Sequence, residues 1–453
     1  MKRANLREMI PVKYLYLQTM GCQMNVSDSE KIAALLQRIG YELTDDQRRA
    51  DLILLNTCSV RARAEEKVYA HLANYVGMKR KKPGLLLGVG GCVAQQEGER
   101  LLDRVPHLDL VFGTHNLHRL PQIVLAAEEG RRLAEVDFID NDTRVNLFPV
   151  DDRPGGVTRF VTVMQGCDNY CSYCIVPYVR GREVSRRAGE IVAEIRQMAE
   201  HGVREITLLG QNVNSYGAKS PDEPDFAGLL RMVSQIPGIE RFRFTTSHPK
   251  DFNRALIQCF AELPKLCSHM HLPAQSGSDA VLAGMNRGYT REHYLSMVTE
   301  LKQARPDIAI TGDMIVGFPG ETAEDFAQTL SLMDEVGYAD LFSFMYSPRP
   351  GTLAAGLSEE LSYEEKRERL ELLQDIQRKG TRRQNEALVG TIDEVLVEGV
   401  SKRGDQLYGR TSGNRVVNFA GDPALIGTMV DVCMTKGYQN SLLGTLAVDS
   451  EAA

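Results

Sequence analysis

The sequence predicts an α/β protein with an N-terminal doubly wound α/β domain, a central partial (β/α)6 barrel and a C-terminal small all-β barrel. Three observations predict this fold class. Apolar runs typical of buried strands alternate with helical patterns over most of the chain, a loop-rich stretch interrupts the alternation, and short strands with polar turns replace it at the end. The 453 residues are enough for about three domains.

The N-terminal domain is expected over residues 12–130. Its apolar runs predict buried parallel strands at 14–18, 52–56, 85–89 and 110–112. Helical patterns follow these strands at 27–39, 64–76 and 95–105, with Ser27 or Ser29 as the expected N-cap of the first helix. This alternation predicts a parallel sheet covered by helices.

A linker is expected over residues 131–157, because this stretch is rich in loop residues and contains DDRPGG at 151–156.

Residues 158–388 then alternate again between strand and helix patterns. Candidate strands lie at 160–165, 205–209, 241–246, 269–272, 309–316 and 341–346. Six strand–helix units predict an open or partial parallel barrel, since the closed eight-stranded form needs two more.

The sequence pattern changes after a long charged helical run at 363–387. Residues 389–450 show short strands at 392–398, 406–411, 415–419, 428–435 and 442–446. Polar turns separate them, which predicts a small all-β barrel of the kind found in nucleic-acid-binding modules.

Composition excludes several classes of protein. Hydrophobic residues make up 43% and charged residues 25%, which is typical of a soluble globular chain. The apolar runs are far shorter than the ~18 residues of a membrane span, and the N-terminus lacks a signal sequence, so we expect a cytoplasmic protein without a membrane partner. Its nine cysteines are then ligands, reactive groups or core residues rather than disulfides. A net charge of −7 excludes a globally basic nucleic-acid binder.

Cys167, Cys171 and Cys174, here called the loop triad, follow the first barrel strand with the spacing C-x3-C-x2-C. Three thiolates in one loop can hold three corners of a [4Fe–4S] cluster and leave one iron open to an external ligand. The loop lies at the C-terminal rim, where such barrels keep their active sites. A zinc site or incidental clustering is the alternative, although structural zinc usually takes four ligands.

Cys22, Cys58 and Cys92, here called the N-terminal triad, lie far apart in the sequence, but each follows a predicted strand. Because the carboxyl ends of parallel strands share one edge of the sheet, these cysteines can converge on one site. They also number three, so a cluster held by them would again keep one iron open. The alternative is three independent buried cysteines. The remaining cysteines, Cys259, Cys267 and Cys433, are expected to be core residues.

These motifs resemble those of the radical S-adenosylmethionine (SAM) methylthiotransferase family. The loop triad resembles the SAM-cleaving motif of radical SAM enzymes. The segments TMGCQMNVSDSEK, NTCSVRARAEEK and GGCVAQ are similar to the N-terminal methylthiotransferase domain, and the C-terminal β module is similar to a TRAM domain, an RNA-binding barrel. The resemblance covers about residues 13–448.

The resemblance implies an enzyme with two [4Fe–4S] clusters that uses SAM as methyl donor and as radical source. The loop triad then holds the SAM-binding cluster and the N-terminal triad the auxiliary cluster. Such chemistry suits an unactivated C–H bond of an adenine ring. The implied partners are tRNA and a reducing electron donor such as flavodoxin or ferredoxin, and a monomer is expected.

Three branches of the family compete. The motifs GCQMN at 21–25, CSVR at 58–61 and SPRPGT at 347–352 are similar to the branch that methylthiolates N6-(dimethylallyl)adenosine (i6A) at position 37 of the tRNA anticodon loop. The other branches act on threonylcarbamoyl-adenosine in tRNA or on an aspartate of a ribosomal protein. A non-catalytic iron–sulfur RNA-binding regulator is the alternative of a different class.

The resemblance also suggests contacts to the cofactor and the RNA. Expected SAM contacts are Tyr173, Gln211, Gln275, Ser276, Asp313 and Ile315. The GFPG stretch at 317–320 has the simpler reading of a strand-to-helix turn. Arg349 is expected to bind a phosphate or a base edge, or else to form a salt bridge at the rim. Basic runs are candidate phosphate contacts, or solvated helix faces, at 79–82, at Arg180, Arg182, Arg186 and Arg187, and at Arg378, Lys379, Arg382 and Arg383.

Overall fold

The computed structural model describes residues 12–59, 64–144, 155–402 and 404–447, which form two compact units. The N-terminal unit holds the described residues up to 144 together with 165–168 and 174–186. The C-terminal unit holds the described residues from 155 to 164, from 169 to 173 and from 187 onward. Residues 151–154 of the predicted DDRPGG linker, and Val60 and Arg61 of the second cysteine motif, lie outside the described residues.

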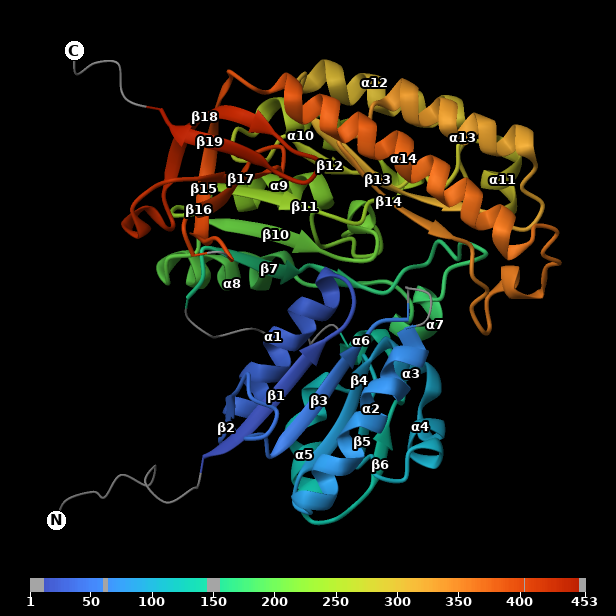
Figure 1. Ribbon diagram of the computed structural model, residues 1–453, viewed down its shortest axis with the longest axis vertical. Helices are drawn as coiled ribbons and strands as arrows, with labels where there is room; N and C mark the ends of the chain where they lie inside the picture. Colours follow the sequence, from blue (N-terminus) through green and yellow to red (C-terminus); the bar gives the residue numbers. More distant parts are fainter. Residues whose placement is uncertain (1–11, 60–63, 145–154, 403, 448–453) are drawn as a thin grey trace. The chain divides into compact units, whose positions relative to one another are not determined.

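The N-terminal unit is built on a six-stranded parallel sheet of order β2-β1-β3-β4-β5-β6 (Figure 1). Its strands are β1 (Lys13–Thr19), β2 (Tyr41–Leu43), β3 (Leu52–Thr57), β4 (Leu86–Gly91), β5 (Leu110–Phe112) and β6 (Leu133–Glu135). The four predicted strands are all present. The short edge strand β2 was not predicted, and β6 lies within the predicted linker and pairs with β5.

Helices cover both faces of this sheet, as a fully parallel sheet requires. One face packs against α1 (Gln23–Gln37) and α5 (Leu120–Glu128). The other packs against α2 (Ala64–Lys81), α3 (Cys92–Glu97) and α4 (Glu99–Arg104). The unit also contains α6 (Asn141–Arg144) and α7 (Val176–Arg180). The predicted doubly wound α/β domain is confirmed.

Helix α1 begins earlier than the sequence pattern predicts. Its N-cap is Cys22, whose backbone N–H donates to Oδ1 of Asn25 at 3.3 Å. Ser27 and Ser29 are buried inside the helix, so neither is the cap. The Ser29 hydroxyl lies 2.7 Å from Oγ1 of Thr19, a contact across the strand–helix layer that local sequence does not reveal.

The C-terminal unit contains six parallel strands in two sheets, β11-β10-β7 and β12-β13-β14 (Figure 1). They are β7 (Thr158–Thr162), β10 (Glu205–Leu209), β11 (Arg241–Phe244), β12 (His269–His271), β13 (Ala309–Val316) and β14 (Asp340–Met345). A parallel bridge between Phe242 and Leu266 joins the two sheets near β11 and β12. The predicted partial barrel of six strands is confirmed.

Helices alternate with these strands and complete the barrel unit. They are α8 (Ala188–Glu200), α9 (Phe226–Ser234), α10 (Arg254–Glu262), α11 (Asp279–Gly284), α12 (Arg291–Ala304) and α13 (Ala323–Val336). Among the described residues, every helix is too short or too polar to cross a lipid bilayer.

A closed five-stranded barrel ends the chain, in the order β15-β16-β17-β19-β18. The strands are β15 (Ile392–Val400), β16 (Leu407–Thr411), β17 (Val416–Phe419), β18 (Met429–Gly437) and β19 (Leu442–Leu446), and the long helix α14 (Tyr363–Ala387) precedes them. This small barrel docks on the larger one: Nη2 of Arg241 donates to the carbonyl of Arg410 at 2.7 Å, and Ser268 N–H donates to Ser412 Oγ at 2.8 Å.

Candidate active site

The N-terminal triad lies at the carboxyl ends of three neighbouring strands. Cys22 follows β1, Cys58 follows β3 and Cys92 follows β4, and these strands are adjacent in the sheet. The chain turns tightly here. Gly21 has a φ of +147°, and a Cβ at this residue would lie 2.5 Å from Cβ of Cys58. The sequence-based expectation of one shared edge is confirmed.

The thiols of this triad interact with one another. A hydrogen bond with Cys58 lowers the pKa of Cys22 to about 6, against burial and with help from the positive charge of Arg180. Burial raises the pKa of Cys92, and the charge of Arg180 opposes that rise. Cys22 is exposed, whereas Cys58 and Cys92 are buried. The edge therefore combines an accessible thiol with two enclosed ones.

The donor set suits an iron–sulfur cluster better than a single ion. Among the described residues, no three His, Cys, Asp or Glu side chains gather closely enough to hold one metal ion. A four-iron cluster is wider than one ion, so its ligands lie further apart. Thiolates are also the ligands that such clusters take.

The loop triad divides between the two units. Cys167 and Cys174 belong to the N-terminal unit and Cys171 to the C-terminal unit. The Cys167 N–H donates to the carbonyl of Gly181 at 3.3 Å. Gly166, with a φ of +81°, is required just before it, because a Cβ there would lie 2.1 Å from the carbonyl oxygen of Arg182.

Cys171 is buried within the barrel unit between two basic side chains. Nη1 of Arg287 donates to its Sγ at 3.3 Å, and Nε2 of His248 lies 3.7 Å from the same sulfur. Burial, together with the charges of Arg287 and Lys250, lowers the pKa of His248 to about 2. His248 is therefore neutral at physiological pH, and the positive charge beside this thiol comes from Arg287.

The rest of the loop is fixed by backbone contacts. Ser172 N–H donates to the carbonyl of Met285 at 3.0 Å, and its hydroxyl donates to the carbonyl of Gly284 at 2.8 Å. Tyr170 adopts a φ of +46°, and Nδ2 of Asn286 donates to its carbonyl at 3.1 Å. Sequence reasoning missed Arg287, His248 and Asn286, because nothing local marks them as neighbours of the loop.

Several predicted SAM contacts come together at β13. Gln275 has a φ of +74°, and its backbone N–H donates to the carbonyl of Asp313 at 2.9 Å. The Ile315 N–H donates back to the Gln275 carbonyl at 2.9 Å. Tyr173 and Ile315 both pack against the small apolar cluster that contains Phe318. Four of the six predicted residues therefore gather around this strand.

Buried polar atoms at the strand ends leave bonding capacity for a ligand. Asn212, next to the predicted Gln211, follows β10, and Ser247 follows β11. Asn212 Oδ1 and Ser247 Oγ are buried and have no hydrogen-bond partner among the described residues. Buried polar groups are normally paired, so this edge retains hydrogen-bonding capacity.

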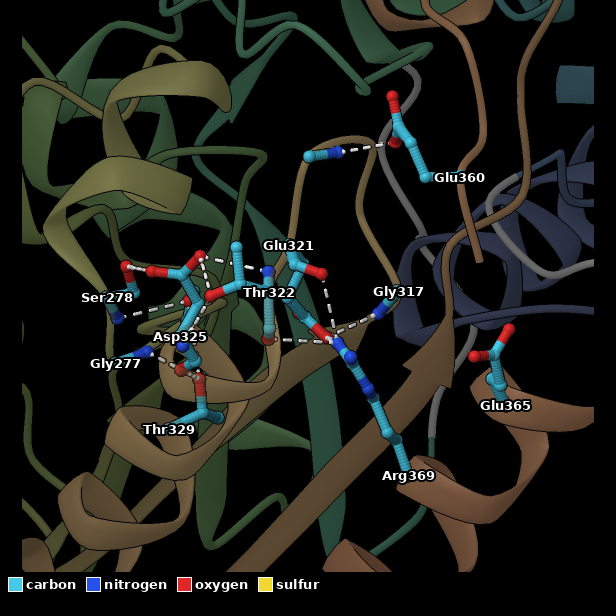
Figure 2. A network of polar contacts seen from close by, with 12 residues as sticks. Gly277, Ser278, Gly317, Glu321, Thr322, Asp325, Thr329, Glu360, Glu365 and Arg369 are labelled. Carbon is cyan, nitrogen blue, oxygen red and sulfur yellow. Dashed lines mark hydrogen bonds and ion pairs between the residues drawn. The ribbon is translucent and has the colours of Figure 1, made fainter. Parts of the chain in front are cut away.

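Ser276 has a structural partner. Its hydroxyl lies 3.3 Å from Oγ1 of Thr329 on α13, and the next residue, Gly277, donates its N–H to the same oxygen at 3.0 Å. Figure 2 shows Asp325 of the same helix bonded to Ser278 and Thr322. This network holds the loop after β12 against α13.

The GFPG stretch forms the expected turn, and a buried acid secures it. Gly317 N–H donates to Oε1 of Glu321 at 3.0 Å, and Nη1 of Arg369 on α14 reaches the same oxygen (Figure 2). Burial raises the pKa of Glu321, and the hydrogen bonds of Gly317 and Arg369 oppose that rise. Helix α14 thus holds the loop that follows β13 in place through Arg369.

Arg349 follows β14 and is partly buried. Its carbonyl accepts hydrogen bonds from the Thr352 N–H and hydroxyl, at 3.1 and 2.8 Å. Its positive charge acts on the Tyr346 phenol, whose pKa is raised mainly by burial. The two readings of Arg349, RNA contact and rim salt bridge, stay predictions.

The basic runs are largely engaged in ion pairs. Lys79 pairs with Asp109, and Lys82 pairs with Asp51 at 2.6 Å. Arg180 and Arg186 are buried, so the expectation that they contact RNA phosphates is wrong. On α14, Arg378 and Lys379 pair with Asp375, and Arg382 pairs with Glu386. These pairs are typical of a solvated helix face.

Comparison with known proteins defines the family. The chain matches models of an uncharacterized protein family, UPF0004, over residues 14–113, of the radical SAM superfamily over 161–333 and of the TRAM domain over 386–447. A protein of Geotalea uraniireducens named tRNA-2-methylthio-N(6)-dimethylallyladenosine synthase is 69% identical over 96% of this chain and 99% of its own. The chain belongs to the tRNA-2-methylthio-N(6)-dimethylallyladenosine synthase family. A Geobacter sulfurreducens synthase is 67% identical over 96% and 98% of the two chains.

Solved structures outside the synthase family share the fold. The radical SAM methyltransferase TsrM from Kitasatospora setae, solved with cobalamin and a [4Fe–4S] cluster, has a TM-score of 0.58 at 17% identity and covers 76% of this chain and 77% of its own. The cobalamin-dependent SAM radical enzyme OxsB has a TM-score of 0.51 at 13% identity, over 71% and 52% of the chains. At these identities the likeness concerns the fold alone.

Proposed function

We propose that this chain converts i6A at position 37 of tRNA into 2-methylthio-N6-(dimethylallyl)adenosine, with SAM as methyl donor and radical source. The observation that carries the proposal is the 69% identity to a named synthase over 96% of the chain. The radical SAM and TRAM matches support both the chemistry and the RNA substrate.

The loop triad is proposed to hold the SAM-binding [4Fe–4S] cluster. That cluster and SAM would supply the radical chemistry that an unactivated adenine C–H bond requires. The protein contributes position and charge. Arg287 places a buried positive charge beside Cys171, and the segment from Ser172 to Tyr173 is anchored through Met285 and the Phe318 cluster.

The N-terminal triad is proposed to hold the auxiliary [4Fe–4S] cluster. Its support is the convergence of three strand ends and the mutual hydrogen bonding of Cys22 and Cys58. We also propose an external one-electron donor such as flavodoxin or ferredoxin. The protein is further proposed to be monomeric and cytoplasmic.

A groove beside β14 is proposed to receive the RNA. Its volume is about 310 Å³, and Phe342, Phe344, Arg378 and Asn440 are among its lining residues. The two phenylalanines are 53% and 38% exposed, which is unusual for large apolar side chains on a barrel strand. Exposed aromatic rings are the surfaces on which unpaired bases stack.

The register of β14 relates this groove to the predicted SAM contacts. Phe342 pairs with Asp313 and Phe344 with Ile315 across the parallel strands. Residues directly paired in a sheet point to the same face. A base stacked on these rings would therefore lie on the face that carries two of the proposed SAM-binding residues.

The decisive experiment is nucleoside mass spectrometry of tRNA from a deletion strain that expresses this chain. The proposed function requires 2-methylthio-i6A in the complemented strain and unmodified i6A in the deletion strain. If tRNA is unchanged and a ribosomal protein instead gains the mass of a methylthio group, the chain belongs functionally to the protein-modifying branch. Absence of SAM cleavage to 5′-deoxyadenosine by reconstituted protein under dithionite would favour the non-catalytic regulator.

A further inference from the structure

A buried ion pair lies beside the N-terminal triad. Nη2 of Arg180, at the end of α7, is 2.7 Å from Oδ2 of Asp28 in α1. The two residues are 152 positions apart in the sequence, and their exposed fractions are only 4% and 7%. Neither side chain is available to an RNA phosphate or to solvent.

The same guanidinium faces two thiols of the triad. Its positive charge acts on both Cys22 and Cys92 and favours the deprotonated form of each thiol. Helix α7 packs directly on Cys92 through Ile175 and Val179. Arg180, the residue after Val179, thus lies beside the thiol edge.

Contacts to two side chains fix the backbone of α7 at its last two residues, Val179 and Arg180. Oγ1 of Thr114 donates to the carbonyl of Val179 at 2.5 Å, and Nε2 of His115 lies 3.1 Å from the carbonyl of Arg180. Thr114 and His115 follow β5 in the same sheet. The guanidinium is therefore held in place by the domain that carries the three cysteines.

A buried charge beside an iron–sulfur cluster changes its reduction potential. Reduction adds one electron, so a nearby cation stabilises the reduced form and raises the potential, and a nearby anion lowers it. Groups beyond the ligands themselves commonly tune metal sites in this way. Asp28 partly neutralises Arg180, so the two residues act in opposite directions.

We propose that Arg180 is a positioning and tuning residue for the auxiliary cluster: its buried guanidinium, set by Asp28, raises the reduction potential of the cluster held by Cys22, Cys58 and Cys92. The inference rests on the proposed function only in that the triad holds a cluster. The electron is supplied by an external low-potential one-electron reductant, which is dithionite in the experiment below.

The test is a redox titration followed by electron paramagnetic resonance. The background variant C167A/C171A/C174A keeps only the N-terminal triad, and R180Q, R180K and D28N are added to it singly. At a fixed potential, R180Q is expected to lower the reduced-to-oxidised ratio at least about tenfold, which is a shift of about −59 mV for one electron. D28N is expected to shift the potential upward, and R180K to stay near the parent.

A matched control is R119Q, which removes an arginine from the more exposed pair with Glu135 in the same unit, at 2.7 Å. It is expected to leave the potential unchanged. An unaltered potential in R180Q with full iron content would overturn the inference. If R180Q fails to fold, D28N decides: an upward shift supports the inference, and no shift overturns it.

The auxiliary cluster and the tuning role of Arg180 can be refuted separately. Absence of iron from the background variant would refute the auxiliary cluster itself. A complete cluster whose potential ignores both Arg180 and Asp28 would refute only the tuning role.

Discussion

Nη1 of Arg287 lies 3.3 Å from Sγ of Cys171, and both side chains are buried. The guanidinium also donates to the Pro273 carbonyl and the Tyr289 hydroxyl, at 2.9 and 3.1 Å. Across the described part of the chain, no carboxylate forms an ion pair with Arg287. A buried cation without a carboxylate partner is costly unless another anion compensates it, and Sγ of Cys171 is placed to do so when it binds a cluster as a thiolate.

The first prediction concerns cluster retention at the loop triad. In a C22A/C58A/C92A background, Arg287→Met should reduce bound iron from about four per chain to about two or fewer, because Cys171 loses its charged partner. Arg287→Lys should retain more iron than Arg287→Met. Iron analysis after anaerobic reconstitution measures this. Arg254→Met, at a highly exposed pair with Glu300, is the control, and equal iron in R287M and R254M would contradict the expectation.

The second prediction concerns the buried charges that join the two barrels. Glu205 accepts hydrogen bonds from both Arg241 and Arg243, and all three side chains are buried. Glu205→Ala leaves two buried cations uncompensated and should cost about 3–5 kcal/mol of stability. Urea unfolding measures the loss. Glu262→Ala, which breaks an exposed pair with Arg231 at 3.3 Å, should cost less than about 1 kcal/mol. Similar losses in the two variants would refute this reading.

The third prediction is a pH dependence set by His115. Burial and the charge of Arg144 lower its pKa to about 4. Its Nδ1 accepts the Ile139 N–H at 3.2 Å, which requires the neutral ring. Because the unfolded chain binds this proton near pH 6.5, stability falls as pH drops from about 6.5 to about 4, by on the order of 3 kcal/mol.

His115→Gln removes this titration and serves as the comparison. The stability advantage of the wild-type protein over H115Q should shrink as pH falls through that window. Urea unfolding at several pH values measures the difference. An advantage that stays constant from pH 7 to pH 4 would show that His115 does not titrate as its surroundings indicate.

The fourth prediction concerns RNA binding in the β14 groove. Phe342→Ala and Phe344→Ala should each weaken binding of an anticodon stem-loop by about tenfold, since base stacking on one ring is worth about 1–3 kcal/mol. Fluorescence anisotropy measures the affinity. Leu372→Ala is a control, because Leu372 is exposed on α14 but does not line the groove. Equal affinities in all three variants would rule the groove out.

Much of the fold follows from local sequence. Strands β10, β13 and β19 begin and end where the sequence pattern predicts, because apolar runs bounded by polar residues mark them. Strand β6 was missed because three half-buried residues, LAE, carry no periodic signal. The early start of α1 was missed because cysteine is not a typical N-cap.

The site was only partly predictable. Placement of Cys22, Cys58 and Cys92 after parallel strands was enough to predict their shared edge. The partners of these thiols were not predictable, since Arg180 comes from a segment 152 residues after Asp28 and its position depends on how α7 packs. Sequence alone grouped Arg180 with surface arginines, and only burial separates it from them.

We propose that the two cysteine triads hold two separate four-iron clusters. Iron and sulfide analysis after anaerobic reconstitution tests it directly in the wild-type protein, in C22A/C58A/C92A and in C167A/C171A/C174A. The expected contents are about eight, four and four irons per chain. A wild-type content of about four irons, or a triple variant that still binds about eight, would contradict the claim.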